Sequence, residues 1–244
     1  MFKAELSNNS IFKDCFESIS KIVDEIVLEC DEEGMRIKTL DRSHITFVHL
    51  ELNNSLFDSY ICDVPEKISI DSVEFMKVLK RCKSNDLLSL TVEDGNFVIK
   101  FVGDSTRTFN IRLIDLEYES AQPPVLEPPV NLELPTDVLK DTLADIELFS
   151  EKIRILADPD KVSFTGDGEF GDTCSEYVHG QVVSDSVSSM FSLDKLKDMM
   201  KAEKLSNVVD IGLGQDMPLL MKFEIGMGDG ELGFLLAPRL EEEE

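Results

Sequence analysis

Apolar and polar residues alternate along several short stretches in the first half of the chain, and this alternation predicts β-strands. The strands are expected at residues 2–6, 26–30, 35–40, 46–52, 87–92, 97–102 and 107–114. In two other stretches, residues 11–23 and 73–82, apolar residues recur at helical spacing instead. Residues 7–10 and 71–72 supply the Ser, Asn and Asp side chains that favour helix N-termini. The pattern predicts an α+β domain with two amphipathic helices.

The second half of the chain repeats this order of elements at low identity. The matched pairs include Lys13 with Lys140 (offset 127), Met76 with Met199 (offset 123) and Phe101 with Phe223 (offset 122). We interpret the likeness as an internal duplication, each copy running strand, helix, hairpin, strands, helix, strands. A chance likeness of two α+β domains is the alternative. Helices of both copies are expected on one side of largely antiparallel sheets.

A proline-rich stretch, residues 116–130, separates the two copies. It holds four of the nine prolines and no Lys or Arg. Proline fixes φ, lacks a backbone donor and pushes the preceding residue towards extended geometry. The stretch is therefore interpreted as a semi-rigid connector, with an ordinary surface loop as the alternative. The predicted domains are residues 1–116 and 131–244, joined by a connecting loop over residues 117–130.

The chain is strongly acidic, with a formal net charge of −25 over 244 residues. Such a charge favours solubility and disfavours simple binding to nucleic acid or to an anionic membrane. No apolar run is long enough to span a bilayer, and the N-terminus lacks the apolar core of a signal peptide. The five scattered cysteines are expected to be reduced thiols of an intracellular protein.

A search for catalytic chemistry is negative. The Gly-x-Gly-x-x-Gly match at residues 228–233 leads into a strand-like run, so no helix N-terminus is available for a pyrophosphate. The acidic segments 158–160 and 166–172 lack the EF-hand ligand spacing. We predict no catalytic residue, no metal site and no cofactor. An acidic hydrolase is the competing class, and it would require carboxylates that converge in a pocket.

Basic residues recur on the predicted helices of this acidic chain. Residues 77–83 contain four bases and no acid, and the matching helix of the second copy carries Lys195, Lys197, Lys201 and Lys204. The first helices carry Lys13 and Lys140 at equivalent places. This pattern indicates a basic surface for a polyanion. An ordinary solvated helix face is the alternative.

Residues 34–50 resemble the proliferating cell nuclear antigen family, the DNA sliding clamps of archaea and eukaryotes. The specific core of the resemblance is Leu40-Asp41-x-Ser43-His44. Tyr60-x-Cys62-Asp63, the acidic connector and the ending at residues 236–240 also fit, and the resemblance covers the whole chain. Because it lacks eukaryotic-type insertions, the chain resembles the archaeal members of the family. The proline pairs 123–124 and 128–129 depart from the eukaryotic connector.

The resemblance implies a fold and a function. The expected fold is a pair of duplicated clamp domains, with antiparallel sheets outside and helices lining the central channel of a homotrimeric ring. The ring would encircle duplex DNA without reading its sequence and would tether DNA polymerase and other replication and repair proteins, without catalysis. The implied partners also include a clamp loader and proteins with a PIP motif, such as flap endonuclease and DNA ligase, but no membrane. The expected location is the archaeal cytoplasm, in association with the nucleoid. A subunit of a heteromeric checkpoint-type clamp is the alternative.

The resemblance also implies three sets of site residues. The expected DNA-contacting residues are Lys13, Lys77, Lys80, Arg81, Lys140, Lys197 and Lys201. The expected pocket for a peptide of the form Gln-x-x-aliphatic-x-x-aromatic-aromatic comprises Leu40, His44, Ile45, Pro123, Val125, Leu126, Leu235, Ala237 and Pro238. The expected ring interface joins residues 106–113 to residues 173–181, with Arg107 and Arg112 pairing with Asp172 and Glu176.

Overall fold

The computed structural model describes residues 1–116, 126–181 and 186–240. Its first half holds β1 (Phe2–Leu6), α1 (Asn9–Ile22), β2 (Glu25–Cys30), β3 (Gly34–Leu40), β4 (Thr46–Asn53), the 3₁₀ turn η1 (Asn54–Leu56), β5 (Ser59–Cys62), β6 (Glu66–Asp71), α2 (Ser72–Leu79), β7 (Leu87–Glu93), β8 (Asn96–Val102) and β9 (Thr106–Arg112). Its second half holds β10 (Val130–Pro135), α3 (Thr136–Glu147), β11 (Lys152–Ala157), β12 (Lys161–Gly168), β13 (Gly171–Val178), β14 (Val187–Ser192), α4 (Leu193–Met199), the 3₁₀ helix η2 (Met200–Lys204), β15 (Val208–Leu213), β16 (Leu219–Ile225) and β17 (Gly230–Leu236).

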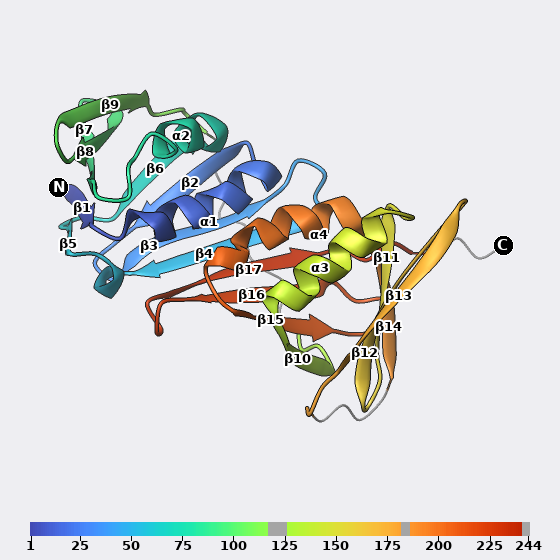
Figure 1. The fold of residues 1–244 in the computed structure, drawn as a ribbon. Coiled ribbons are helices and arrows are strands. Elements are labelled where there is room, and N and C mark those ends of the chain that lie inside the picture. The colour runs from blue at the N-terminus through green and yellow to red at the C-terminus, as the bar shows by residue number, and fades with distance from the viewer. Residues whose placement is uncertain (117–125, 182–185, 241–244) are drawn as a thin grey trace.

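In the described residues the strands form three antiparallel sheets. Their orders are β5-β1-β7-β8-β9, β10-β15-β16-β17-β4-β3-β2-β6 and β13-β12-β11-β14. The helices pack side by side in the order α2, α1, α4, α3, and together they form one layer against the sheets (Figure 1). This arrangement confirms the predicted α+β class with all helices on one side. None of the helices in these ranges is long and apolar enough to span a membrane.

Local sequence explains the elements. The apolar stripe of α1 is buried against the sheet, with Phe12, Phe16 and Ile19 fully covered. The carboxylate of Asp71 caps α2 by accepting from the backbone N–H of Glu74 at 2.8 Å. Gly34 begins β3 with φ of +153°, and a Cβ there would lie 2.0 Å from the carbonyl oxygen of Leu52.

The two halves are structural repeats. The offset of 127 carries α1 onto α3 and β2 onto β11, as the sequence predicts. For the second helices, however, the predicted offset of 123 is wrong. An offset of 121 superposes α2 on α4 and aligns the buried Phe75 with the buried Leu196. The offset of 123 comes from the short match of Ser69-x-Asp71 with Ser192-x-Asp194, and this match misled the alignment because the duplication preserves burial and not identity.

Some boundaries also differ from the prediction. The second helix ends at Leu79 instead of continuing to Cys82, and a turn follows it. Strands β5 and β6 were not expected: β5 has only four residues, whereas β6 does alternate, with Ile68 and Ile70 buried.

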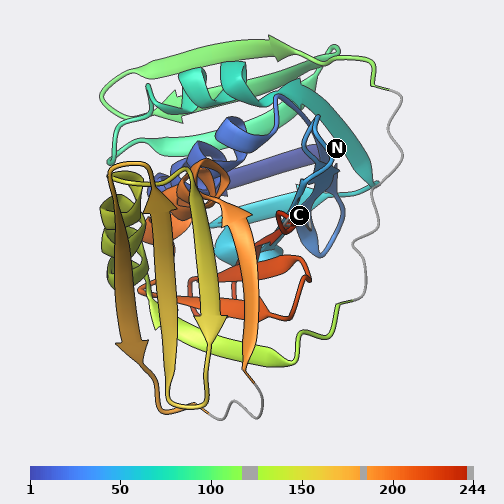
Figure 2. The same ribbon diagram turned by 90° about the vertical axis from the view of Figure 1, so that its right-hand side faces the viewer.

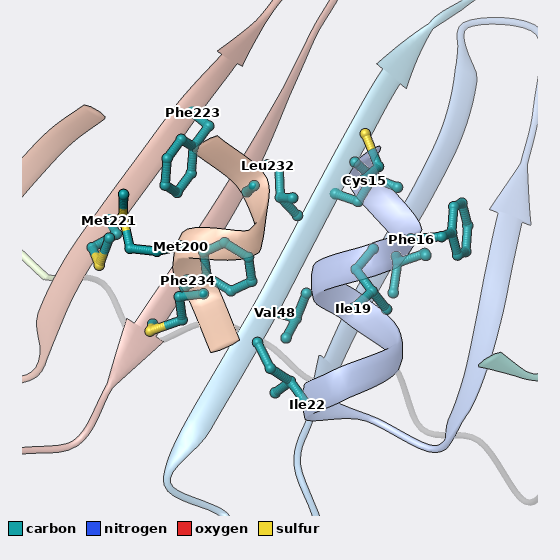
Figure 3. Packing of buried hydrophobic residues seen from close by; sticks show 14 of the residues in the cluster. Cys15, Phe16, Ile19, Ile22, Val48, Met200, Met221, Phe223, Leu232 and Phe234 are labelled. Atoms are coloured by element: carbon teal, nitrogen blue, oxygen red, sulfur yellow. The ribbon is translucent and has the colours of Figure 1, made fainter. Parts of the chain in front are cut away.

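The halves are joined by more than the connector. Strand β17 of the second half pairs with β4 of the first half, from Gly230 opposite Leu52 to Leu236 opposite Thr46. The eight-stranded sheet therefore crosses the boundary between the repeats. Figure 3 shows Val48 of β4 between the apolar side chains of α1 and those of β17 and Met200, so the halves share a continuous apolar core.

Candidate functional site

The helical layer has a charge balance unlike the rest of the chain. Residues 9–22, 72–83, 136–147 and 193–204, which form the helices and the turn after α2, contain eleven Lys and Arg and ten Asp and Glu. Since the whole chain has 24 basic and 49 acidic residues, the entire acidic excess lies outside this layer. The layer is the surface on which a polyanion meets the least repulsion.

The predicted DNA-contacting residues all lie on this layer or in the turn that follows α2. Lys77 forms an ion pair with Glu74 at 2.6 Å, Lys140 pairs with Glu203 at 2.7 Å, and Lys197 pairs with Glu147. Lys13 is partly buried and donates to the carbonyl oxygen of Cys82 at 2.9 Å. Lys80, Arg81 and Lys201 are exposed. Exposed ion pairs are weak, so the paired lysines can still exchange a carboxylate for a phosphate.

The turn over residues 80–86 is held by side chains from several elements. Asn9 donates to the carbonyl oxygens of Lys83 and Asp86, at 2.9 and 2.7 Å. Arg107 of β9 forms an ion pair with the buried Asp86 carboxylate and donates to the carbonyl oxygen of Arg81 at 2.8 Å. These bonds satisfy carbonyl groups of the turn itself and fix it in one shape.

A hollow of about 180 Å³ lies on the same layer between α3 and the α4–η2 segment. Three of the predicted DNA-contacting lysines line it, namely Lys140, Lys197 and Lys201. Leu143 and Met200 contribute apolar lining. The hollow therefore gathers basic side chains of the second half around one concave spot.

The predicted ring-interface strands are both sheet edges in the described residues. Strand β9 ends the five-stranded sheet and β13 ends the four-stranded sheet. Figures 1 and 2 show the two strands far apart at opposite ends of the molecule. Exposed apolar side chains lie near β13, including Val178 at 76% and Phe170 at 95% exposure.

The four predicted interface charges divide into two kinds. Arg112 and Asp172 are exposed on their strands. Arg107 instead binds Asp86 of its own chain, and Glu176 pairs with Lys161 on the neighbouring strand. Two of the four charges are therefore already engaged within one chain, which sequence order alone could not reveal.

The loop between β3 and β4, residues 41–45, is called the signature loop here. The buried carboxylate of Asp41 accepts from the backbone N–H groups of Ile45 and Thr46, both at 2.9 Å, and from the hydroxyl of Ser43. Lys195 of α4 donates to the same carboxylate at 2.8 Å. Burial raises the pKa of Asp41, but these hydrogen bonds outweigh it and lower that pKa to about 2.

The structure brings most of the predicted pocket pieces together. The backbone N–H of Ala237 donates to the carbonyl oxygen of Ile45 at 2.8 Å, which places the C-terminal segment beside the signature loop. Ile45 is 37% exposed and Leu40 is 40% exposed. His44 is exposed and has φ of +59°, a left-handed conformation that the Asp41 bonds hold in place.

An apolar strip crosses the sheet face beside this loop. Leu40 and Leu235 both stand opposite Phe47 in the strand register, and Leu220 stands opposite Leu235. Directly opposite residues point to the same face of a sheet. Leu40, Phe47, Leu235 and Leu220 therefore form one row, called the apolar strip below.

The end of the connector packs beyond this strip. A Cβ on Gly212 would lie 2.6 Å from Pro128, so Pro128 closely covers β15 there. Leu126 is partly buried, and Pro238 is partly buried after β17. Pro123 and Val125, also predicted for the pocket, lie outside the described residues.

Sequence reasoning missed three residues of this region: Phe47, Asp41 as the organiser of the loop, and Lys195 as its partner. The alternation of residues 46–52 could have placed Phe47 on the face opposite Val48. Nothing in the sequence order pairs Asp41 with Lys195. In the described residues no group of three or more His, Cys, Asp or Glu could hold a metal ion.

Comparisons with known proteins agree along the whole chain. The family model described as the N-terminal domain of the proliferating cell nuclear antigen matches residues 1–122, and the corresponding C-terminal model matches residues 129–239. A protein named DNA polymerase sliding clamp from Methanobrevibacter smithii is 55% identical over 244 residues, covering 100% of both chains. One of the same name from Methanothermobacter thermautotrophicus is 50% identical with the same coverage. The crystal structure of PCNA from Thermococcus kodakaraensis has a TM-score of 0.91 at 26% identity and covers 98% of this chain and 100% of that one.

Proposed function

The chain belongs to the proliferating cell nuclear antigen family and is a sliding clamp for DNA polymerase, and we propose that three copies close into a ring around duplex DNA. The observation that supports the ring is the pair of edge strands, β9 and β13, which lie at opposite ends of the molecule in its described parts. Two different edges make a head-to-tail contact, which closes into a ring when the rotation permits. Backbone hydrogen bonds between the edges would extend the sheet across each junction.

In the proposed ring the helical layer faces the DNA. The acidic sheets then face solvent, and the nearly neutral helices with their exposed bases meet the phosphates. Enclosure keeps the ring on the duplex by topology, so each phosphate contact need only be weak and independent of sequence. This division explains how a chain with a net charge of −25 works on DNA.

We propose that partner proteins bind at the signature loop and the apolar strip. A peptide with an aliphatic and two aromatic anchors would place them against Leu40, Ile45 and Leu235, and its backbone would run beside the segment after β17. DNA polymerase, a clamp loader, flap endonuclease and DNA ligase are the partners proposed for this surface. Tethering at such a site raises a partner's effective concentration at the template to about millimolar.

Light scattering on the purified chain tests the ring. We expect three times the mass of one chain at micromolar concentration. In a separate DNA-retention assay, the ring loaded on closed circular DNA should be retained, and it should be lost after the same DNA is linearised. A chain that stays monomeric until a different subunit is added would support a heteromeric clamp instead. The full-length relatives named DNA polymerase sliding clamp do not favour that alternative.

A further inference from the structure

The two halves of the chain meet beneath the signature loop. The loop belongs to the first half, between β3 and β4, whereas Lys195 lies on α4 of the second half. Their ion pair, between Lys195 Nζ and Asp41 Oδ2 at 2.8 Å, spans 154 positions in sequence. The position of α4 is itself fixed, because Ser18 of α1 donates to the carbonyl oxygen of Asp198 at 2.9 Å.

The two oxygens of the Asp41 carboxylate have different partners. Oδ1 accepts only from the first half, through the N–H groups of Ile45 in the loop and Thr46 at the start of β4. Oδ2 accepts from Ser43 and from Lys195. The loop thus supplies the hydrogen bonds that shape it, and the second half supplies the charge that the carboxylate needs.

That charge matters because the Asp41 side chain is only 3% exposed. A buried carboxylate without a cation is strongly destabilised and tends to move towards solvent or take up a proton. Among the described residues, Lys195 is the sole ion-pair partner of Asp41. Arg42, the other cation nearby in sequence, pairs with Asp24, and both of those side chains are exposed.

We infer that Lys195 is a positioning residue for partner binding: it holds the Asp41 carboxylate, and through it Ile45, in the shape that receives the partner peptide. The inference rests on the proposed function, since it assumes that the signature loop is the peptide site. It separates Lys195 from the other α4 bases, because Lys197 pairs with Glu147 on α3 and lines the DNA-facing hollow instead.

Lys195→Met tests this role, because it removes the charge and keeps the length of the side chain. Lys204→Met is the matched control: Lys204 also forms an ion pair across the two halves, with Glu17 at 3.2 Å, but lies away from the signature loop. Both variants, and Ile45→Arg as a benchmark, are titrated in calorimetry with a synthetic peptide of the form Gln-x-x-aliphatic-x-x-aromatic-aromatic. Light scattering and thermal denaturation report on assembly and folding.

We expect Lys195→Met to weaken peptide binding by about tenfold or more, because breaking a buried ion pair leaves an uncompensated charge. Lys204→Met should bind within about twofold of wild type, since exposed pairs contribute little. Lys195→Arg should restore most of the affinity. Asp41→Asn combined with Lys195→Met should bind better than Lys195→Met alone, because the amide oxygen still accepts from Ile45 while the buried charge is gone. A general loss of structure would not produce this recovery.

Two results would overturn the inference: wild-type affinity in Lys195→Met, or an equal loss in Lys204→Met. A double variant no better than Lys195→Met alone would likewise show that the buried charge is not the cause. If Ile45→Arg also retains wild-type affinity, the proposed peptide site is wrong. If Ile45→Arg abolishes binding and Lys195→Met does not affect it, the site stands and only the role of Lys195 falls.

Discussion

Arg107 on strand β9 can form its ion pair either with the next copy in the ring or within its own subunit. The resemblance implies that its charge pairs with an acidic residue of the next copy in the ring. In the structure its guanidinium binds Asp86, donates to Arg81 and stands 5.2 Å from the centre of the Phe101 ring, all within one chain. Arg107→Met removes the charge and keeps an apolar stem of similar length. We predict that this variant loses stability within the subunit and keeps the ring.

The magnitude follows from the burial of the pair. Removing one member of a buried ion pair typically costs about 3–5 kcal/mol. Asp86 is 6% exposed, but Arg107 is 27% exposed, and Asp86 also keeps the backbone N–H of Lys83 at 2.8 Å. Partial solvent access and the remaining hydrogen bond reduce the expected loss to about 2 kcal/mol in the free energy of unfolding.

Denaturant unfolding followed by circular dichroism measures this loss, and light scattering measures the ring. Unfolding is recorded at several protein concentrations, because assembly adds a concentration-dependent term to apparent stability. Arg112→Met, an exposed arginine on the same strand, is the matched control, and its expected change in stability is below about 0.5 kcal/mol. Asp86→Asn combined with Arg107→Met should recover part of the loss. An Arg107→Met subunit of unchanged stability that has become monomeric would refute this reasoning and place the guanidinium in the junction between copies.

Two further predictions concern the proposed surfaces. Ile45→Arg puts a charge where an apolar anchor would bind, so it should cost the peptide complex about 2 kcal/mol or more in calorimetry; wild-type affinity with intact assembly would place the site elsewhere. Lys80→Glu should lower stimulation of DNA polymerase more than Lys77→Glu, because Glu74 already offsets the charge of Lys77, while the assembled mass stays the same. The loss should be independent of DNA sequence, and a difference between templates would contradict it.

The features that the sequence predicts well are those written into local periodicity. The apolar stripe of residues 11–23 gives α1, and the alternation of residues 46–52 gives β4, because burial of one face selects both patterns. The duplication is visible for the same reason, since the two copies bury equivalent positions. The prediction is weakest where one short match outweighed that pattern, at the second pair of helices.

The ion pairs between side chains of distant elements could not be predicted from the sequence. Lys195 and Lys197 are two positions apart on one helix, yet one contacts Asp41 and the other contacts Glu147. Arg107 and Arg112 lie on one strand, yet only Arg107 has a buried carboxylate beside it. Which partner each charge finds depends on how distant elements pack, and no spacing rule within one element contains that information. The family resemblance predicted which surfaces contact DNA, peptide and the next copy, whereas the ion pairs and hydrogen bonds within those surfaces are known only from the structure.

The ladder between β4 and β17 has a mechanical consequence. A subunit built as two bodies on a flexible connector would bend at its middle, and a ring of such subunits could open by hinging inside any one of them. Here such a hinge would have to break a row of backbone hydrogen bonds and split a shared core. We therefore expect each subunit to resist bending at its middle and to deform instead by a twist distributed over the sheet. In the proposed ring the most deformable points are the three junctions between copies, so we expect a clamp loader to open the ring at one of these junctions.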